Sequence, residues 1–222
     1  MVDDNLTEEI ITEDNAIIQD GVVVKYVAHN LVGVRKKIII PDEILGIDFS
    51  AFEGRGEIES VVIGKNVQSI ACSAFSGCIN LRELIVSSDN PHLYSDGNCI
   101  IRRDNKRMII GCKASVIPAD GSVTTVWSAF HACTGLTEIA IPEGVERLNA
   151  LAFYGCENLR EASLPSTLKF VGHEAYAGCK SLKKIIFNGS AERFLTIADD
   201  NQCIPKRAVI QCLDGNFFGA EG

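Results

Sequence analysis

Nine cysteines are the residues of this chain with the most varied chemistry, because thiols can bind metals, form disulfides or act as nucleophiles. Four of them, Cys78, Cys133, Cys156 and Cys179, recur at one position of a repeated phrase. Zinc sites favour close pairs such as C-x2-C, which the sequence lacks, and ligands strung along a repeat axis do not converge on one ion. We therefore expect a ladder of small, reduced, buried side chains, and neither a metal nor a cofactor.

The other cysteines leave the question of disulfides open. Cys112 takes a strand position and is expected in the core. Cys99 and Cys112 flank an insertion, while Cys203 and Cys212 lie in the C-terminal region, so either pair could bridge in an oxidising compartment. The four histidines are scattered, and no combination of acid, base and nucleophile emerges. We expect that the protein is not an enzyme.

The composition excludes some classes of binding partner. The chain has 222 residues and a formal net charge of −8, which argues against nucleic acid because phosphate binding favours a basic face. Its acidic start lacks the features of a secretory signal, and no apolar run is long enough for a membrane helix. As written, the chain would be cytoplasmic, but the sequence leaves its compartment open; it is expected to be monomeric, with a protein as its partner.

The repeated phrase defines the elements that position these residues. It is anchored on an alanine followed by an aromatic residue, and successive copies are 23 residues apart except for one step of 55. The copies lie at Ala51-Phe52, Ala74-Phe75, Ala129-Phe130, Ala152-Phe153 and Ala175-Tyr176. A unit this short cannot bury its apolar side alone, so the units must stack.

Each phrase leads into an alternating stretch of the form L-x-x-Φ-x-Φ, where Φ is apolar. This alternation indicates a short strand, and a proline often follows it. The seven expected strands are 35–40, 58–63, 81–86, 112–117, 136–141, 159–164 and 182–187. Stacking makes them parallel, with the alanine-aromatic arcs as short helical turns or irregular structure.

This pattern resembles the leucine-rich repeat, and the arc "xxAFxGCxxL" resembles the bacterial BspA-like (treponemal-type) subclass. The resemblance implies a solenoid with parallel strands on a concave face, arcs on the convex face and a β-hairpin insertion. It also implies a binding role without catalytic residues. Members of this family are often exposed on the cell surface or secreted, and some are adhesins.

The expected organisation has three parts. Residues 1–34 form an N-terminal tail and cap, residues 35–187 the solenoid with an insertion at about 87–111, and residues 188–222 a C-terminal cap. Within the insertion, 99–102 and 107–110 should pair as a hairpin around "RDNK". "SAERFLTIA" should be a helix with Ser190 as its N-cap.

The candidate binding surface is the outward side of the strands. The residue between the last two Φ positions reads Ile39, Val62, Ile85, Val116, Ala140, Ser163, Ile186. Charged residues flank this strip, at Lys36, Lys37, Glu59, Arg82, Glu83, Lys113, Glu138, Arg160, Glu161, Lys183 and Lys184. The candidate binding residues are Ile39, Val62, Ile85, Val116, Glu83, Glu138, Arg160 and Glu161. A second candidate is the basic patch of the insertion, Arg102, Arg103, Lys106 and Arg107.

Two interpretations of this strip remain open. An apolar strip with a charged rim is typical of an interaction face for a protein or glycan. β-branched residues also suit any exposed strand, which would leave a structural or spacer role in a larger assembly.

Overall fold

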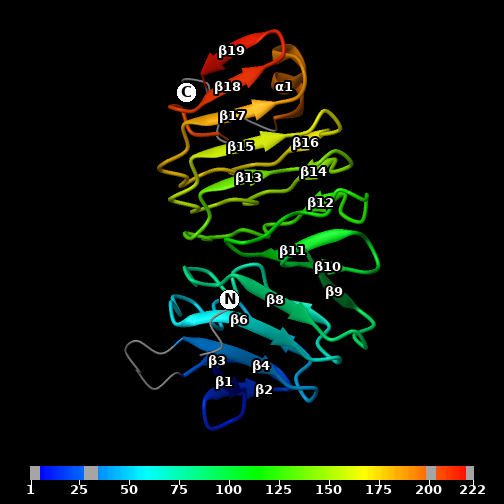
Figure 1. Ribbon diagram of the computed structural model, residues 1–222, viewed down its shortest axis with the longest axis vertical. Coiled ribbons are helices and arrows are strands. Elements are labelled where there is room, and N and C mark those ends of the chain that lie inside the picture. Colours follow the sequence, from blue (N-terminus) through cyan, green and yellow to red (C-terminus); the bar gives the residue numbers. More distant parts are fainter. Residues whose placement is uncertain (1–5, 28–34, 199–203, 219–222) are drawn as a thin grey trace.

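The computed structural model describes residues 6–27, 35–198 and 204–218. Its strands stack along one long axis from the N-terminal to the C-terminal region (Figure 1). Most repeats contribute a strand to one side of the stack and a two-residue strand to a second side. The protein is therefore the parallel β-solenoid that the 23-residue period predicts.

The principal side carries two sheets. The first has the order β1-β4-β6-β8 and the second the order β13-β15-β17-β18-β19. Every pairing in them is parallel except that of β18 with β19. Their bounds are β1 Thr7–Ile10, β4 Lys36–Ile40, β6 Ile58–Ile63, β8 Glu83–Val86, β13 Glu138–Ala140, β15 Glu161–Leu164, β17 Lys184–Phe187, β18 Val209–Cys212 and β19 Gly215–Phe218.

The second side carries the insertion strands, the N-terminal hairpin and the two-residue strands of the repeats. One sheet has the order β2-β3-β5-β7 and the other β16-β14-β12-β11-β10-β9. Their bounds are β2 Ala16–Gln19, β3 Val22–Tyr26, β5 Gly46–Ile47, β7 Ser69–Ile70, β9 Leu93–Asp96, β10 Cys99–Arg102, β11 Arg107–Gly111, β12 Thr125–Val126, β14 Arg147–Leu148 and β16 Phe170–Val171.

The insertion contains the predicted hairpin, because β10 and β11 pair antiparallel. It also contains β9, which pairs antiparallel with β10 and was not predicted. On its other edge β11 pairs parallel with β12, so the insertion is built into the solenoid wall.

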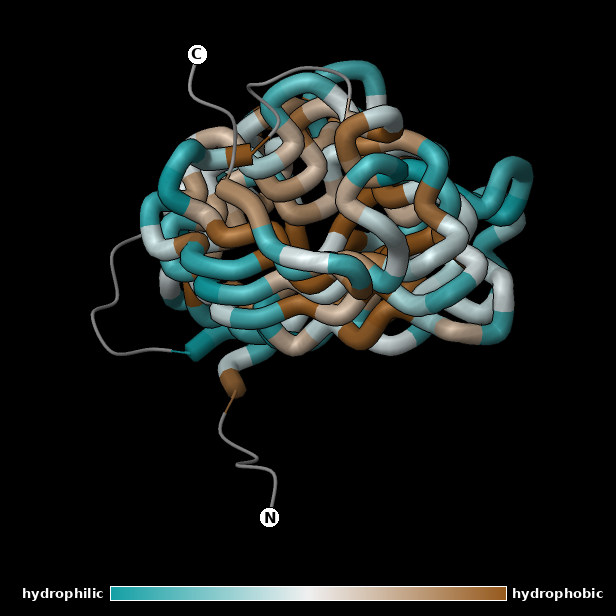
Figure 2. Tube along the Cα trace, turned by 90° about the horizontal axis from the view of Figure 1, so that it is seen from above, coloured by the Kyte–Doolittle hydropathy of each residue, from teal (hydrophilic) through white to brown (hydrophobic). Residues whose placement is uncertain are grey.

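The hairpin divides the core into two apolar clusters. On β10, Ile100 belongs to the N-terminal cluster, whereas Cys99 and Ile101 belong to the C-terminal cluster. Successive side chains of a strand point to opposite faces, so a strand buried on both faces acts as a wall between two cores. Figure 2 shows apolar stretches inside the molecule and polar stretches around its periphery.

The arcs consist of turns, and their rings stack in two columns, the first of which begins with Tyr26 of β3. Tyr26, Phe52 and Phe75 lie 5.3 and 5.2 Å apart, and Phe130, Phe153 and Tyr176 lie 5.1 and 5.0 Å apart. These are ordinary separations for stabilising aromatic pairs. The aromatic column, like the core, is therefore built in two parts.

The glycine position of the arc requires a positive φ. Gly54, Gly77, Gly155 and Gly178 have φ between 71° and 74°. The third copy has Ala132 at this position, with φ 50°. A Cβ makes this backbone region unfavourable, so this arc carries strain that its neighbours avoid.

The predicted helix is present as α1, Ala191–Ile197, and Ser190 caps it by accepting a hydrogen bond from the Arg193 amide at 3.2 Å. Phe194 packs edge-on against Phe187 and Phe217. At the other end, β1 pairs with β4, and the hairpin β2–β3 pairs with β5. The boundaries 1–34, 35–187 and 188–222 remain a proposal.

The prediction of a strand at 112–117 was wrong, because this segment forms no strand. The segment 95–98, which is the end of β9 and the turn that follows it, takes the place that a neighbouring strand would need. Asn98 Oδ1 and Ser95 Oγ accept from the backbone amides of Leu84 and Val86, at 3.4 and 3.0 Å. The Val116 amide donates to the Gly97 carbonyl at 2.8 Å, and a Cβ on Gly97 would lie only 2.0 Å from the Val116 oxygen. Side chains at the end of this segment therefore still alternate between inward and outward directions, although the segment does not pair with a neighbouring strand.

Candidate functional site

Four apolar residues form a continuous row on the outward side of the first principal sheet. In the register of the strands, Ile10 lies beside Ile39, Ile39 beside Val62, and Val62 beside Ile85. Ile10 is 55% exposed and Ile85 is 39% exposed, while Ile39 and Val62 are half-buried. We call this row the apolar stripe.

The inward and outward faces agree with the sequence alternation. Val61 and Ile63 flank Val62 and are fully buried, and Leu84 and Val86 flank Ile85 and are also buried. Side chains on alternate positions of a strand point to opposite faces, so the stripe residues are those left for solvent. Ile10 was not predicted. The sequence contains a signal for it. In "TEEI" two acidic residues precede an isoleucine, in "KKII" two basic residues precede isoleucines, and opposite charges of this kind suit neighbouring strands.

Charged residues pair along one side of the stripe. Lys37 Nζ lies 2.8 Å from Glu8 Oε1, and Arg82 Nε donates to Glu59 Oε2 at 3.0 Å. The hydrogen bond to Glu8 raises the pKa of Lys37. Glu83 is exposed and accepts a hydrogen bond from Ser60 Oγ at 2.5 Å. Glu59, expected on the outward rim, is buried.

Lys36 was also expected on the charged rim, but it is buried. It aligns with Ile58, which faces the core, and so takes an inward position. Its Nζ meets Glu9 Oε2 at 2.5 Å and donates to the Tyr26 hydroxyl at 2.9 Å. Burial raises the pKa of Tyr26 to about 12. Burial opposes the charge on Lys36, but the hydrogen bonds with Glu9 and Tyr26 outweigh it and leave the pKa raised.

Val116 does not continue the stripe, because the segment 95–98 lies between residues 112–117 and β8. It is 72% exposed and lies beside a hollow of about 220 Å³ that Glu138, Ala140 and Ser163 also line. Val116 is therefore an isolated apolar projection.

The C-terminal sheet has no apolar stripe comparable to that of the N-terminal sheet. Ala140 and Ser163 hold the equivalent positions and lie side by side in register. Glu138 pairs in register with Glu161, and Glu161 lies 3.5 Å from Lys184 Nζ. Arg160 is exposed. The predicted residues Glu138, Arg160 and Glu161 thus surround a polar face, away from the apolar stripe.

Three cations of the predicted insertion patch already have partners. Arg102 forms a two-pronged pair with Asp104, each contact at 3.1 Å. Arg103 Nε donates to the carbonyls of Asn90 and Leu93, and Lys106 Nζ donates to that of Gly121. The Arg107 guanidinium instead stacks on Trp127, 4.5 Å from the ring centre. Among the described residues, Arg107 is the member of the patch whose side chain has neither a hydrogen-bond acceptor nor a carboxylate partner.

The repeated cysteines are bonded within the stack. Cys78, Cys156 and Cys179 donate to the carbonyls of Phe52, Phe130 and Phe153 in the preceding repeat, at 3.0, 2.9 and 3.1 Å. Burial raises the pKa of Cys78 to about 12. Cys133 is half-buried. Cys99 and Cys112 are free thiols, and Cys203 lies outside the described residues.

The densest gathering of thiols lies at the boundary between the two core clusters. Cys72, Cys78, Cys112 and Cys133 line a gap of about 10 Å³ together with His131. The His131 ring lies 3.0 Å from Ser76 Oγ, and burial lowers its pKa. Within the described part of the chain, no group of His, Cys, Asp and Glu has a geometry suited to a metal ion.

Known proteins share the repeat of this chain. The BspA type leucine rich repeat region matches in six copies, over residues 31–97 and 112–201. A leucine-rich repeat protein from Eubacterium ventriosum superposes with a TM-score of 0.51 at 20% identity, over 68% of this chain and 54% of that one. A leucine-rich repeat protein from Bacteroides ovatus gives 0.44 at 23% identity, over 82% and 43%. The pneumococcal vaccine antigen PcpA gives 0.46 at 16% identity, over 81% and 62%.

The chain spans about half the length of the Eubacterium ventriosum structure that it matches. A comparison with functionally curated proteins gives no significant match. Within residues 6–27, 35–198 and 204–218, no helix has both the length and the apolar character needed to cross a membrane.

Proposed function

Because the chain belongs to the BspA-type leucine-rich repeat family, we propose that it is a non-catalytic binding module that presents its apolar stripe to a protein partner. Repeats of this family and their fold are generally non-catalytic, and membership suggests a protein-interaction module. The observation that carries the proposal is the register of Ile10, Ile39, Val62 and Ile85, which places four apolar side chains side by side on the surface.

The physical argument concerns where binding energy would come from. Apolar side chains at the centre of an interface usually contribute more affinity than the charges around them. The pairs Lys37–Glu8 and Arg82–Glu59 are already formed, so they would influence approach and specificity more than affinity. A more specific form of this proposal is a role in adhesion, and identification of the bound partner tests it.

The experiment compares two double variants. Val62→Lys with Ile85→Lys places two charges in the stripe, where both side chains point away from the core. Ala140→Lys with Ser163→Lys places the same charges at the equivalent positions of the C-terminal sheet. Each protein is immobilised and exposed to a native lysate or host extract, and retained proteins are identified by mass spectrometry.

We expect a protein that is retained by the wild type and by the control pair but not by the stripe pair. Melting curves of all three proteins establish that both variants are folded. A partner that binds the stripe pair as tightly as the wild type would place the site elsewhere. Retention of a glycan instead of a protein would change the partner class.

A further inference from the structure

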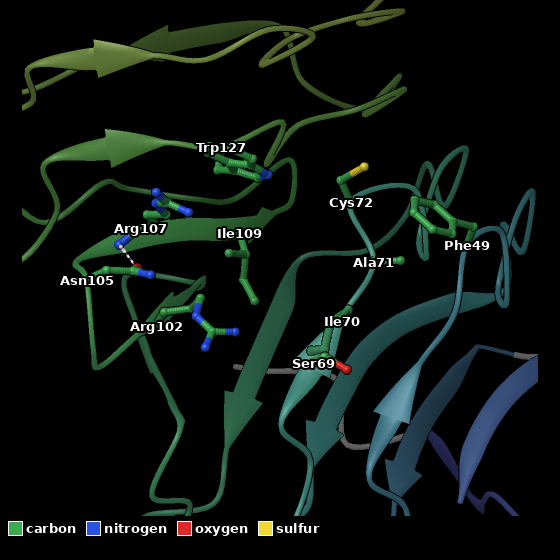
Figure 3. A pocket seen from close by; sticks show the side chains of 10 residues that line it. All are labelled: Phe49, Ser69, Ile70, Ala71, Cys72, Arg102, Asn105, Arg107, Ile109 and Trp127. Atoms are coloured by element: carbon green, nitrogen blue, oxygen red, sulfur yellow. Dashed lines mark hydrogen bonds between the residues drawn. The ribbon is translucent and has the colours of Figure 1, made fainter. Parts of the chain in front are cut away.

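A groove on the second side of the solenoid has a composition unlike that of the apolar stripe. It lies between the segment Ser69–Cys72 and the insertion and has a volume of about 440 Å³. Figure 3 shows Arg107, Ile109 and Trp127 on one side of it and Ser69–Cys72 with Phe49 on the other. This volume lies within the range typical of ligand-binding pockets.

The groove exposes two aromatic rings over an apolar floor. Phe49 is 65% exposed and Trp127 is 40% exposed, whereas Ile70 and Ile109 beneath them belong to the core. Large rings that remain in water beside a preformed hollow favour an apolar group that covers them. A side chain of aromatic or large aliphatic type fits this requirement.

One wall of the groove is positively charged, although the protein as a whole carries a net charge of −8. Arg102 is neutralised by Asp104 at 3.1 Å. Arg107 has no carboxylate within ion-pair distance among the described residues, and Trp127 holds its guanidinium at 4.5 Å. A stacked guanidinium has lost much of its side-chain freedom already, so it can pair with an incoming carboxylate at a reduced entropic cost.

Asn105 adds a second polar group at the same wall. Its side-chain oxygen accepts a hydrogen bond from the Arg107 backbone amide at 3.2 Å, which fixes the side chain beside the guanidinium. Its amide NH2 group then remains as a donor at the groove. Arg107 and Asn105 together offer donors to one carboxylate, next to the space that the rings enclose.

We propose that this groove binds an acidic peptide segment of a protein partner. A large apolar side chain of the peptide enters between Phe49 and Trp127, and a neighbouring carboxylate pairs with Arg107. The site is separate from the apolar stripe and does not depend on it, because the two lie on different sides of the solenoid.

The test begins with a displayed library of random 12-residue peptides selected on the full chain. Enriched peptides are synthesised and titrated against the protein, and the fluorescence of Trp127, the single tryptophan of the chain, reports on occupancy. We expect enrichment of peptides with Asp or Glu next to Phe, Leu or Ile, and a saturable change in fluorescence.

Variants then assign the contacts. Arg107→Gln should weaken binding about thirtyfold or more, as the loss of one partner of a desolvated ion pair does. Phe49→Ser should weaken it as well, and its exposed side chain can be changed without loss of folding. Arg147→Gln is the matched control, because Arg147 stacks on Phe170 at 4.3 Å outside the groove, and it should leave binding unchanged.

Two results would overturn the proposal. One is a selection that yields no excess of acidic and apolar peptides over the starting library. The other is a set of peptides that bind Arg107→Gln and Phe49→Ser as tightly as the wild type. Peptides that lose binding only with Val62→Lys and Ile85→Lys would belong to the apolar stripe, so the two sites fail independently.

Discussion

Replacing Phe153 with alanine should cost more stability than the same change at Phe75. Phe153 is fully buried between Phe130 at 5.1 Å and Tyr176 at 5.0 Å, so it has a ring on each side. Truncation of a buried phenylalanine costs about 3–5 kcal/mol. Phe75 ends its column and has only the Phe52 ring at 5.2 Å among the described aromatic contacts. We expect Phe75→Ala to cost about 1 kcal/mol less, which is the contribution of one aromatic pair.

The measurement is equilibrium unfolding in urea, followed by circular dichroism and by the fluorescence of Trp127. Two probes are needed because stacked repeats can lose cooperativity, and free energies are comparable only where both transitions coincide. Phe153→Leu serves as the control. It keeps most of the apolar volume but loses both aromatic pairs, so its cost should be about 2 kcal/mol, below that of Phe153→Ala.

The reasoning fails if Phe153→Ala and Phe75→Ala lower the free energy of unfolding equally. It also fails if Phe153→Ala costs less than about 1 kcal/mol, since that is below the usual range for a packed phenylalanine. Either result would mean that the ring columns contribute little beyond ordinary apolar contact.

Four further changes have defined outcomes. Hydrogen bonds from the next repeat, led by that of the Ser166 amide, lower the pKa of Glu143 to about 2. The Glu143 carboxylate therefore stabilises the fold above about pH 4.5, and this contribution is lost as the pH falls toward 2. The melting temperatures of Glu143→Gln and the wild type should differ most at pH 7 and converge in acid. Thiol labelling mapped by mass spectrometry should modify half-exposed Cys72 in the native protein and Cys156 only after denaturation, and rapid native labelling of Cys156 would contradict its burial. Ala132→Gly should raise stability by about 0.5–1 kcal/mol in urea, because it relieves a positive φ. Deleting residues from 188 onward should cause unfolding or aggregation, seen by circular dichroism and gel filtration, since α1 and β18 cover the end of the core; a soluble truncation with an unchanged melting temperature would argue against a capping role.

The 23-residue period predicted the solenoid because each strand depends on local alternation and on an equivalent neighbour one repeat away. The same logic failed at 112–117, where the insertion places the segment 95–98 in the position of the neighbouring strand. Lys36 was assigned outward because charge on a strand usually faces water. Its partners, Glu9 and Tyr26, come from segments outside the repeat pattern, and the sequence carries no periodic signal for them.

The stripe and the groove differ in how far the sequence could reveal them. Ile39, Val62 and Ile85 recur at one repeat position, so their alignment follows from the period. Phe49 and Trp127 share a repeat position, two residues before the alanine of the arc, but Arg107 lies in the insertion. The groove exists only because the insertion brings its strand close to the segment 69–72. Contacts across an interruption in a repeat cannot be read from the repeat itself.

The boundary at the hairpin also determines how the molecule would respond to a mechanical load. Within each half, tension along the long axis is shared by neighbouring β-ladders and by thiol–carbonyl bonds between successive repeats. Between the halves, side-chain acceptors on Ser95 and Asn98 replace the ladder beside β8. Under a pulling force the halves would part there first, and the N-terminal cluster would lose Ile100, because β10 stays paired with β11, which pairs with β12 of the C-terminal half. The hairpin, buried on both faces, would then provide the surface on which the halves rejoin when the force is released.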